Sequence, residues 1–313
     1  MTDEWATENE RATAGEASMA EGDAWAADGD AWLTDGAASA RWAYGTGFRD
    51  PFVDINLAVA PATDPEQLAA RCLMLGDDAL VYSHRLQQWI TRLPELEEEM
   101  AVANIALDLL GQARLLLTRA GHLLGTDEDR LAFFRSEHEF RNVRLVERAD
   151  ADFAELVGRL LVFSTWRLEL LRRLRESSDP GLAAIAERGA TELAYHREYA
   201  ADWVVRLGDG TELSHQRMQA GLTAFWPYVD ELFQPDPVLA DLPGALADPA
   251  GVRAEVDAVL DSVLATATLQ RPDVTPAAGV GGRTGRGGVH TEDLGYLLAE
   301  MQSVARAHPE GVW

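Results

Sequence analysis

Two short segments of this chain carry residue types that could hold a metal, Asp108-Leu-Leu-Gly111 and Glu192-Leu-Ala-Tyr195. Each begins with a carboxylate at the spacing of the Glu-x-x-His pairs of carboxylate-bridged di-iron bundles. That spacing puts both ligands on one helix face, where the carboxylate bridges the metals and the histidine caps one of them. Glycine and tyrosine stand at the two histidine positions here. The pattern predicts a degenerate site at Asp108, Gly111, Glu192 and Tyr195, with no metal ligand, cofactor-binding residue or catalytic residue in this chain.

The first of these segments lies in a polar stripe on an otherwise apolar helix, formed by Asn104, Asp108 and Gly111 or Gln112. Such a stripe could be half of a metal site or a hydrogen-bonded polar network. Polar groups inside a bundle must be paired, whichever of the two they form. Carboxylates without histidine suit iron poorly, so the composition of the stripe favours the network.

On the second segment's helix, Glu192, His196 and Tyr199 recur at four and three residues and therefore share a face. A helical pair four residues apart can chelate a metal, as in the helix of zinc metalloproteases. The rest of that zinc motif is missing. We therefore predict a hydrogen bond between Glu192 and His196 inside the bundle.

Four further carboxylates could bridge metals from neighbouring helices: Asp77, Asp78, Glu155 and Glu169. None falls cleanly on the apolar stripe of its helix. We therefore expect most of them to be solvated.

One literal Glu-x-x-His does occur, Glu212-Leu-Ser-His215, directly after the turn Gly208-Asp209-Gly210. It stands alone and at a helix end, where acidic residues are favoured by the helix dipole. Its position predicts a role at the helix terminus rather than in a metal site.

The loop at 279–288 is rich in glycine and contains Arg283 and Arg286. Backbone N–H groups and guanidinium forks can cradle a phosphate, including that of coenzyme A. The loop lacks the Gly-Lys-Ser/Thr ending of a P-loop, and no strand precedes it. A mobile connection or a partner-contact loop is the favoured interpretation, with phosphate binding as the alternative.

The elements that must position these residues are helices. Apolar residues recur at steps of three and four from Asp64 onward, and no segment shows the two-residue alternation of strands. Residues 100–117 are apolar nearly all round, which is typical of a central bundle helix. Two helical hairpins joined by one long crossover predict an all-α, ferritin-like bundle with extra C-terminal helices. The expected helices span 64–93, 94–121, 131–134, 150–175, 182–207, 212–233, 251–270 and 291–307.

Composition separates residues 1–62 from the helical domain at 63–313. The first fifty residues hold eleven Asp or Glu against three Arg, a net charge of −8. Acidic sequence rich in Ala and Gly, with few branched aliphatic residues, is usually disordered. The extension also carries Trp5, Trp25, Trp32 and Trp42, so a segment that folds on a partner is the alternative.

The whole chain has a net charge of −25, with 52 acidic residues against 27 basic ones. Such a charge disfavours nucleic acid and anionic membrane surfaces. Cys72 is the single cysteine, so no internal disulfide can form and a reducing cytoplasm fits. No apolar run appears long enough to span a bilayer, and no signal peptide is evident. These features predict a cytoplasmic protein.

Four stretches resemble one known family, the structural C subunits of the bacterial phenylacetyl-CoA epoxidases: residues 94–114, 134–142, 203–211 and 288–302. The resemblance extends from about residue 68 to residue 313 and does not include the acidic extension. It implies a multicomponent monooxygenase in which a separate ferritin-like subunit holds the di-iron centre and epoxidises the ring of phenylacetyl-CoA. It also implies a reductase that delivers electrons from NADPH through FAD and an iron–sulfur cluster.

In that family, the C subunit has the fold of the catalytic subunit without a working metal site and pairs with it as a structural partner. The resemblance thus implies a non-catalytic subunit of a hetero-oligomer, inactive alone. Two alternatives remain open. The chain could be a catalytic di-metal oxygenase with an atypical carboxylate site, or a metal-free helical scaffold for another partner.

Overall fold

The computed structural model describes residues 52, 55, 57–59, 63–93, 95–235 and 249–311. The chain divides into a unit of residues 54–312 and a second unit of residues 1–53 with residue 313, and the following concerns the first unit. The predicted extension at 1–62 lies almost entirely outside the described residues, so its disorder stays a prediction.

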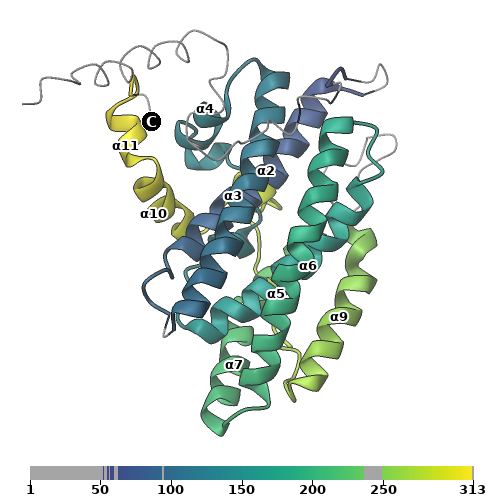
Figure 1. Cartoon of the computed structure of the whole chain (residues 1–313), viewed down its shortest axis with the longest axis vertical. Helices are drawn as coiled ribbons and strands as arrows, with labels where there is room; N and C mark the ends of the chain where they lie inside the picture. The colour runs from purple at the N-terminus through teal and green to yellow at the C-terminus, as the bar shows by residue number, and fades with distance from the viewer. Residues whose placement is uncertain are drawn as a thin grey trace, which may run out of the picture. The chain divides into compact units, whose positions relative to one another are not determined.

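The first hairpin consists of α2 (Pro65–Gln87) and α3 (Leu96–Leu124), which lie side by side in Figure 1. Asp64 caps α2 by accepting a hydrogen bond from the backbone N–H of Glu66, and proline occupies the first turn. Gly125, in the left-handed conformation with φ of 70°, ends α3. These local signals explain why the predicted starts of both helices and the end of the second are close to the observed ones. The predicted end of the first helix at residue 93 is wrong, because α2 ends at Gln87 and turns follow.

The second hairpin consists of α5 (Phe153–Leu174) and α6 (Pro180–Gly208). Asp152 and Asp179 cap the two helices through their side chains. Gly189 of α6 lies against Leu171 of α5, at a point where an added Cβ would come within 2.7 Å of the leucine Cδ1 atom. The small residue therefore permits a close approach of the two helices.

A crossover joins the hairpins and contains α4 (Glu128–Phe133) and two 3-10 turns, Glu137–Glu139 and Arg144–Glu147. The predicted short helix at 131–134 therefore begins three residues earlier, after the side-chain cap of Asp127. Ion pairs with almost no exposure attach the crossover to the rest of the molecule, among them Asp77 with Arg135 and Glu231 with Arg144.

The C-terminal part adds α7 (Glu212–Phe225), α9 (Arg253–Thr266), α10 (Glu292–Met301) and α11 (Ser303–Ala307). The predicted helix at 212–233 is wrong at its end, because Pro227 cannot continue the α-helical hydrogen bonds and two 3-10 turns follow. The predicted helix at 291–307 is interrupted at Gln302. Its side-chain amide is buried and donates to the backbone carbonyls of Ala132 and Arg135.

The all-α, ferritin-like prediction is confirmed: two hairpins, one crossover and additional C-terminal helices make up this unit. Within the described ranges, the extended pairing consists of one isolated bridge between Val280 and Arg283. The four long helices enclose a core that includes Tyr82 and Trp166, whose indole N–H donates to the carbonyl of Leu232.

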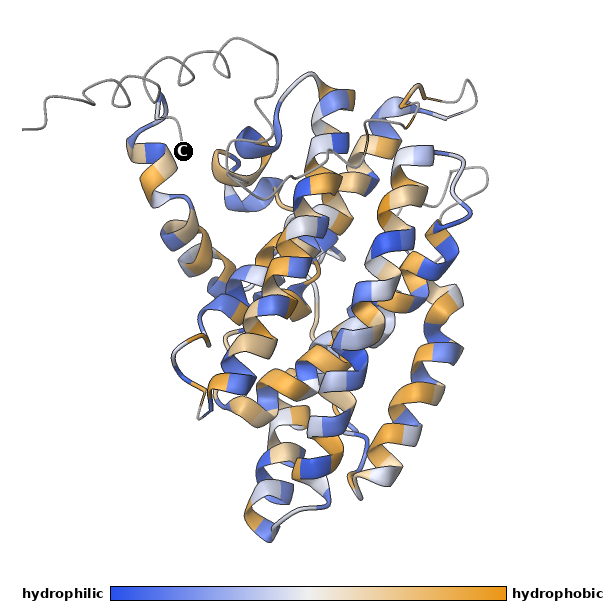
Figure 2. Cartoon of the chain, viewed as in Figure 1, coloured by the Kyte–Doolittle hydropathy of each residue, from blue (hydrophilic) through white to orange (hydrophobic). Residues whose placement is uncertain are grey.

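Helix α3 differs from the prediction for a fully central helix. Met100 and Leu107 are each 58% exposed, although α3 lies against α2, α4 and α6. By length and composition alone α3 could cross a membrane, which corrects the expectation that no such segment exists; core helices of soluble proteins pass the same test. Figure 2 shows hydrophobic turns along α3.

Candidate site at the polar centre of the bundle

Helices α3 and α6 are joined by two hydrogen bonds between side chains. The carboxylate of Asp108 lies 3.0 Å from Nε2 of His196, and the amide of Gln112 donates to Glu192 across 3.0 Å. The two helices run antiparallel, so Gln112, one turn after Asp108 on α3, pairs with Glu192, one turn before His196 on α6. Asp108 and Gln112 of the polar stripe predicted for α3 therefore belong to a hydrogen-bonded network, as the sequence favoured, whereas Asn104 is exposed.

The predicted hydrogen bond between Glu192 and His196 is wrong. Glu192 accepts instead from Gln112 and from Arg188, whose Nε lies 2.8 Å from its other oxygen. His196 is 1% exposed and faces Asp108. Each side chain has a partner on the neighbouring helix, and Nδ1 of His196 is buried without a hydrogen-bond partner among the described residues.

The centre of this network is the guanidinium of Arg167, on α5, which is fully buried. Its Nε donates to the side-chain oxygen of Gln112 across 3.0 Å, and its Nη1 donates to the backbone carbonyl of Leu75 across 3.1 Å. A cation is therefore held among α2, α3 and α5 in the interior of the bundle.

The charges around Arg167 keep this cation in place. Burial lowers its pKa to about 10, while the carboxylates of Asp78 and Glu192 raise it. The side chain therefore remains protonated near neutral pH. Burial also raises the pKa of Asp78, and the guanidinium groups of Arg286 and Arg167 oppose that shift. Each of the four long helices thus contributes one polar side chain: Asp78, Gln112, Arg167 and Glu192.

Of the four degenerate positions, only Glu192 contributes to this centre. Tyr195 is 70% exposed, and the buried residue one turn after Glu192 is His196 instead. Nothing lies within 4 Å of a Cβ added to Gly111, so this position also borders open space. The Asp108 side chain is 41% exposed.

This donor set does not fit a di-iron centre. In the described part of the chain, no group of three or more His, Cys, Asp or Glu side chains is placed to hold a metal ion. A buried guanidinium stands where four helices converge, and a second cation there would be repelled. That this chain binds no metal stays a prediction, since it depends on binding measurements.

Comparison with known proteins shows the family of this chain. Residues 56–313 match the model of the family described as phenylacetic acid catabolic protein. The chain belongs to this family. A relative, the C subunit of 1,2-phenylacetyl-CoA epoxidase from Escherichia coli strain K12, is 43% identical over 250 residues, which cover 79% of this chain and 99% of the relative. The resemblance drawn from the four sequence stretches is confirmed.

The other carboxylates of this family member have structural partners. Asp77, Asp78 and Glu155 are buried, and Glu169 is largely covered, so the expectation that they are mostly solvated is wrong. Hydrogen bonds and ion pairs offset the cost of their burial. Asp77 accepts from Arg135 and from the backbone N–H of Arg141, and Asp78 accepts from Arg286 and from the backbone N–H of Val143. Glu155 accepts from the backbone N–H of Ala151, and Glu169 accepts from Arg172.

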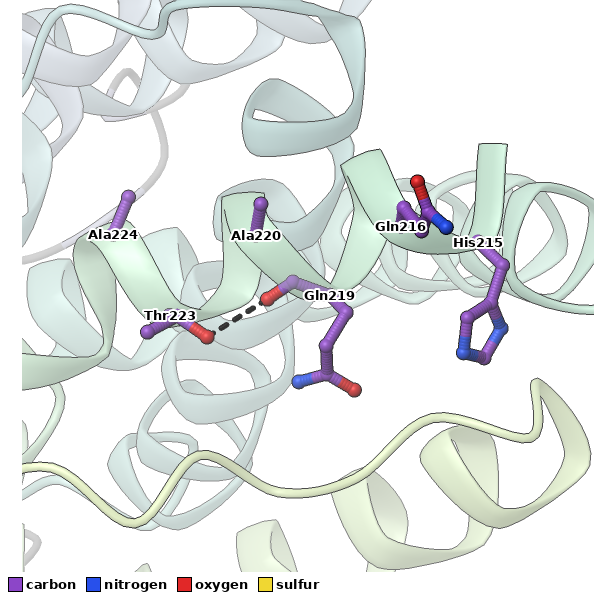
Figure 3. A pocket seen from close by; sticks show the side chains of 6 residues that line it. All are labelled: His215, Gln216, Gln219, Ala220, Thr223 and Ala224. Atoms are coloured by element: carbon purple, nitrogen blue, oxygen red, sulfur yellow. Dashed lines mark hydrogen bonds between the residues drawn. The ribbon is translucent and has the colours of Figure 1, made fainter. Parts of the chain in front are cut away.

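The Glu-x-x-His at 212–215 acts at helix ends, as predicted. Glu212 lies in the first turn of α7, and Nδ1 of His215 lies 2.7 Å from the carbonyl oxygen of Gly208, the last residue of α6. The same histidine borders a shallow, open pocket along α7 (Figure 3). The other residues of its lining have amide, hydroxyl or methyl side chains, an assortment without a nucleophile and base pair: Gln216, Gln219, Ala220, Thr223 and Ala224.

The loop at 279–288 is attached to the bundle at Gly285 and Arg286, whereas its residues 279–283 are exposed, so mobility stays a prediction for that part alone. Arg286 donates to both carboxylate oxygens of Asp78 and to the carbonyls of Met74 and Arg141. Gly285 is in such close contact with the carbonyl of Asn142 that a Cβ would collide with it. Arg286 is therefore committed to a core carboxylate rather than to a phosphate.

The sequence analysis missed Arg167, the residue at the centre of the network. Its position carried a signal, because Leu160, Phe163, Arg167 and Leu171 follow one another at steps of three and four on α5. A charged residue on the apolar stripe of a bundle helix is a candidate for a buried, paired group.

Proposed function

We propose that this chain is a non-catalytic, structural subunit of a multicomponent phenylacetyl-CoA epoxidase, which pairs with a separate catalytic di-iron subunit and stabilises it. The observation that carries the proposal is the buried guanidinium of Arg167, bonded to α2 and α3. The similarity to the C subunit of the E. coli epoxidase supports the same assignment.

A physical argument connects the guanidinium to the loss of catalysis. In a di-iron bundle, metal cations neutralise the carboxylates that project from four helices. Here Arg167, with Arg188 and Arg286 on neighbouring carboxylates, supplies that positive charge from side chains. The four helices therefore pack together without metal, and the resulting rigid bundle can support a partner subunit. A rigid neighbour can hold the helices of a catalytic site in a fixed geometry.

The remaining chemistry belongs to other components under this proposal. The catalytic subunit holds the di-iron centre and the phenylacetyl-CoA ring, and a reductase supplies electrons from NADPH through FAD and an iron–sulfur cluster. The subunits work in the cytoplasm in aerobic phenylacetate breakdown. This chain contributes a surface and no cofactor.

The experiment is expression of this chain alone and together with the catalytic subunit of the same host. We expect the chain alone to carry far less than stoichiometric iron and to show no oxygen-dependent conversion of phenylacetyl-CoA. The two chains together should co-elute in size-exclusion chromatography and turn over substrate once the reductase is added. About two irons per chain with turnover by this chain alone would show a catalytic di-metal oxygenase. Failure to co-elute would favour a scaffold for another partner.

A further inference from the structure

Helix α3 leaves an apolar face uncovered. Leu96 is 66% exposed, and Met100 and Leu107 are each 58% exposed. On the adjacent helix α6, Tyr195 is 70% exposed, and it directly precedes the His196 that bonds to α3. The four exposed side chains, Leu96, Met100, Leu107 and Tyr195, are called the α3 face below.

The α3 face has the spacing of a helix-docking seam. Leu96, Met100, Ala103, Leu107 and Leu110 follow at steps of four and three, and Ala103 and Leu110 are half-buried. Apolar residues at this spacing form a straight stripe against which another helix packs. The open space beside Gly111 allows the backbone of such a helix to approach closely.

The apolar content of this helix exceeds what the bundle covers. Only 44% of the most apolar 18-residue window of α3 is buried. Scattered exposed apolar side chains are ordinary in monomers, whereas several on one face of one helix mark an interaction site.

Charge at one end of the α3 face narrows the choice of occupant. Glu97, Glu98 and Glu99 stand in the first turn of α3, and Glu198 and Asp202 lie on α6. Both sets of acidic residues lie at the same end of the α3 face, because the antiparallel pairing of Asp108 with His196 and of Gln112 with Glu192 brings the start of α3 beside the later part of α6. An occupant that complements this end carries Arg or Lys beside its apolar stripe.

The same charge disfavours two other occupants. A second copy of this chain would bring together two molecules of net charge −25. The N-terminal fifty residues carry −8 and would face the acidic end with like charge. A separate subunit with basic residues would not be repelled in either of these ways.

We propose that the α3 face is the surface on which the catalytic subunit docks, through a helix with an apolar seam and basic residues at one end. This inference rests on the proposed function and adds to it the location and chemistry of the interface. The α3 face is contributed by the two helices that the Asp108–His196 and Gln112–Glu192 bonds hold together. Docking there therefore depends on the same contacts that form the polar centre.

The test compares Leu107→Asp with Leu213→Asp on α7, because these leucines have exposures of 58% and 59%. Both variants should melt like the wild type, since each changes an exposed side chain. Affinity for the catalytic subunit, measured by calorimetry, should fall at least about tenfold for Leu107→Asp and stay unchanged for Leu213→Asp. Affinity of the wild type should also fall as salt rises.

The outcomes separate this inference from the proposed function. If the wild type does not bind the catalytic subunit, the proposed function fails. If the wild type binds and Leu107→Asp binds equally well, the proposed function stands and the α3 face is not the interface. A wild-type dimer that Leu107→Asp converts to a monomer would assign the face to a second copy. An affinity that does not change with salt would contradict the proposal that the docking helix carries basic residues at its end.

Discussion

Removal of the Arg167 guanidinium would affect the groups around it differently. Glu192 also pairs with Arg188, and Asp78 also pairs with Arg286, so both carboxylates keep a cation. The side-chain oxygen of Gln112 and the carbonyl of Leu75 depend on Arg167 for the bonds described above. Removing the guanidinium would therefore strand one buried acceptor, the side-chain oxygen of Gln112, because the carbonyl of Leu75 lies within α2 and also accepts the helical hydrogen bond.

We expect Arg167→Met to lower the free energy of unfolding by about 2 kcal/mol, because the buried Gln112 oxygen loses a hydrogen bond from a charged donor. The matched control is Arg172→Met on the same helix. Its side chain is 46% exposed and pairs with Glu169, so its removal should cost less than about 1 kcal/mol. Urea unfolding followed by circular dichroism measures both.

A double variant sharpens this result. Adding Gln112→Leu to Arg167→Met removes the stranded acceptor, so the double variant should lose less than the sum of the single losses. Equal losses for Arg167→Met and Arg172→Met would show that the buried guanidinium has no special role in the bundle.

At the residue scale, the sequence predicted the polar positions on α3 and α6 but not their pairing, and it missed Arg167 on α5. Positions three and four after Glu192 both lie near its face of the helix, and they differ by about 100° around the axis. Only the rotation of α6 against α3 decides that His196 is buried and Tyr195 exposed. That rotation depends on the packing of all four helices, which no local spacing encodes.

At the scale of elements, helix starts with a capping side chain were predicted well, as at Asp64 and Asp179. Helix interruptions caused by residues far away in the sequence were not predicted. The amide of Gln302 separates α10 from α11 by bonding to carbonyls in and just after α4. Its partners lie about half the chain away, so the pattern of residues 291–307 alone resembles one continuous helix.

Two glycines on the α3 and α6 helices should respond oppositely to alanine. A Cβ on Gly111 would meet nothing within 4 Å, so Gly111→Ala should stabilise the chain by about 0.5–1 kcal/mol through helix propensity. A Cβ on Gly189 would meet Leu171 at 2.7 Å and Gln112 at 3.2 Å, so Gly189→Ala should destabilise it by about 1–3 kcal/mol. Thermal and urea unfolding of the two variants measure the difference. A shift of the same sign in both would contradict the close packing of α6 against α5 and α3.

At the scale of the whole molecule, the net charge of −25 lies on residues outside the most buried ion pairs. Several arginines are used inside the protein, where each neutralises a carboxylate in an ion pair with little exposure. These pairs are Arg119–Asp179, Arg135–Asp77, Arg144–Glu231, Arg159–Asp150 and Arg286–Asp78. Each contributes no net charge, so the full −25 belongs to the other residues of the chain. Composition predicted an acidic protein, but not that its arginines hold the crossover and the C-terminal loop to the bundle.

Removal of residues 1–53 tests whether the helical unit is complete without them. The unit begins at residue 54, the family match begins at residue 56, and the E. coli relative is covered almost entirely by the matched region. We therefore expect a chain starting at Asp54 to unfold at the same temperature as the full chain and to bind the catalytic subunit with the same affinity at high salt.

The removed segment carries −8, and long-range charge acts mainly on encounter rates, so the association rate at low salt should fall if the partner surface is basic. Stopped-flow association at two salt concentrations, beside a thermal melt, measures both effects. A lower melting temperature or lost binding at high salt would place the extension within the fold or the interface.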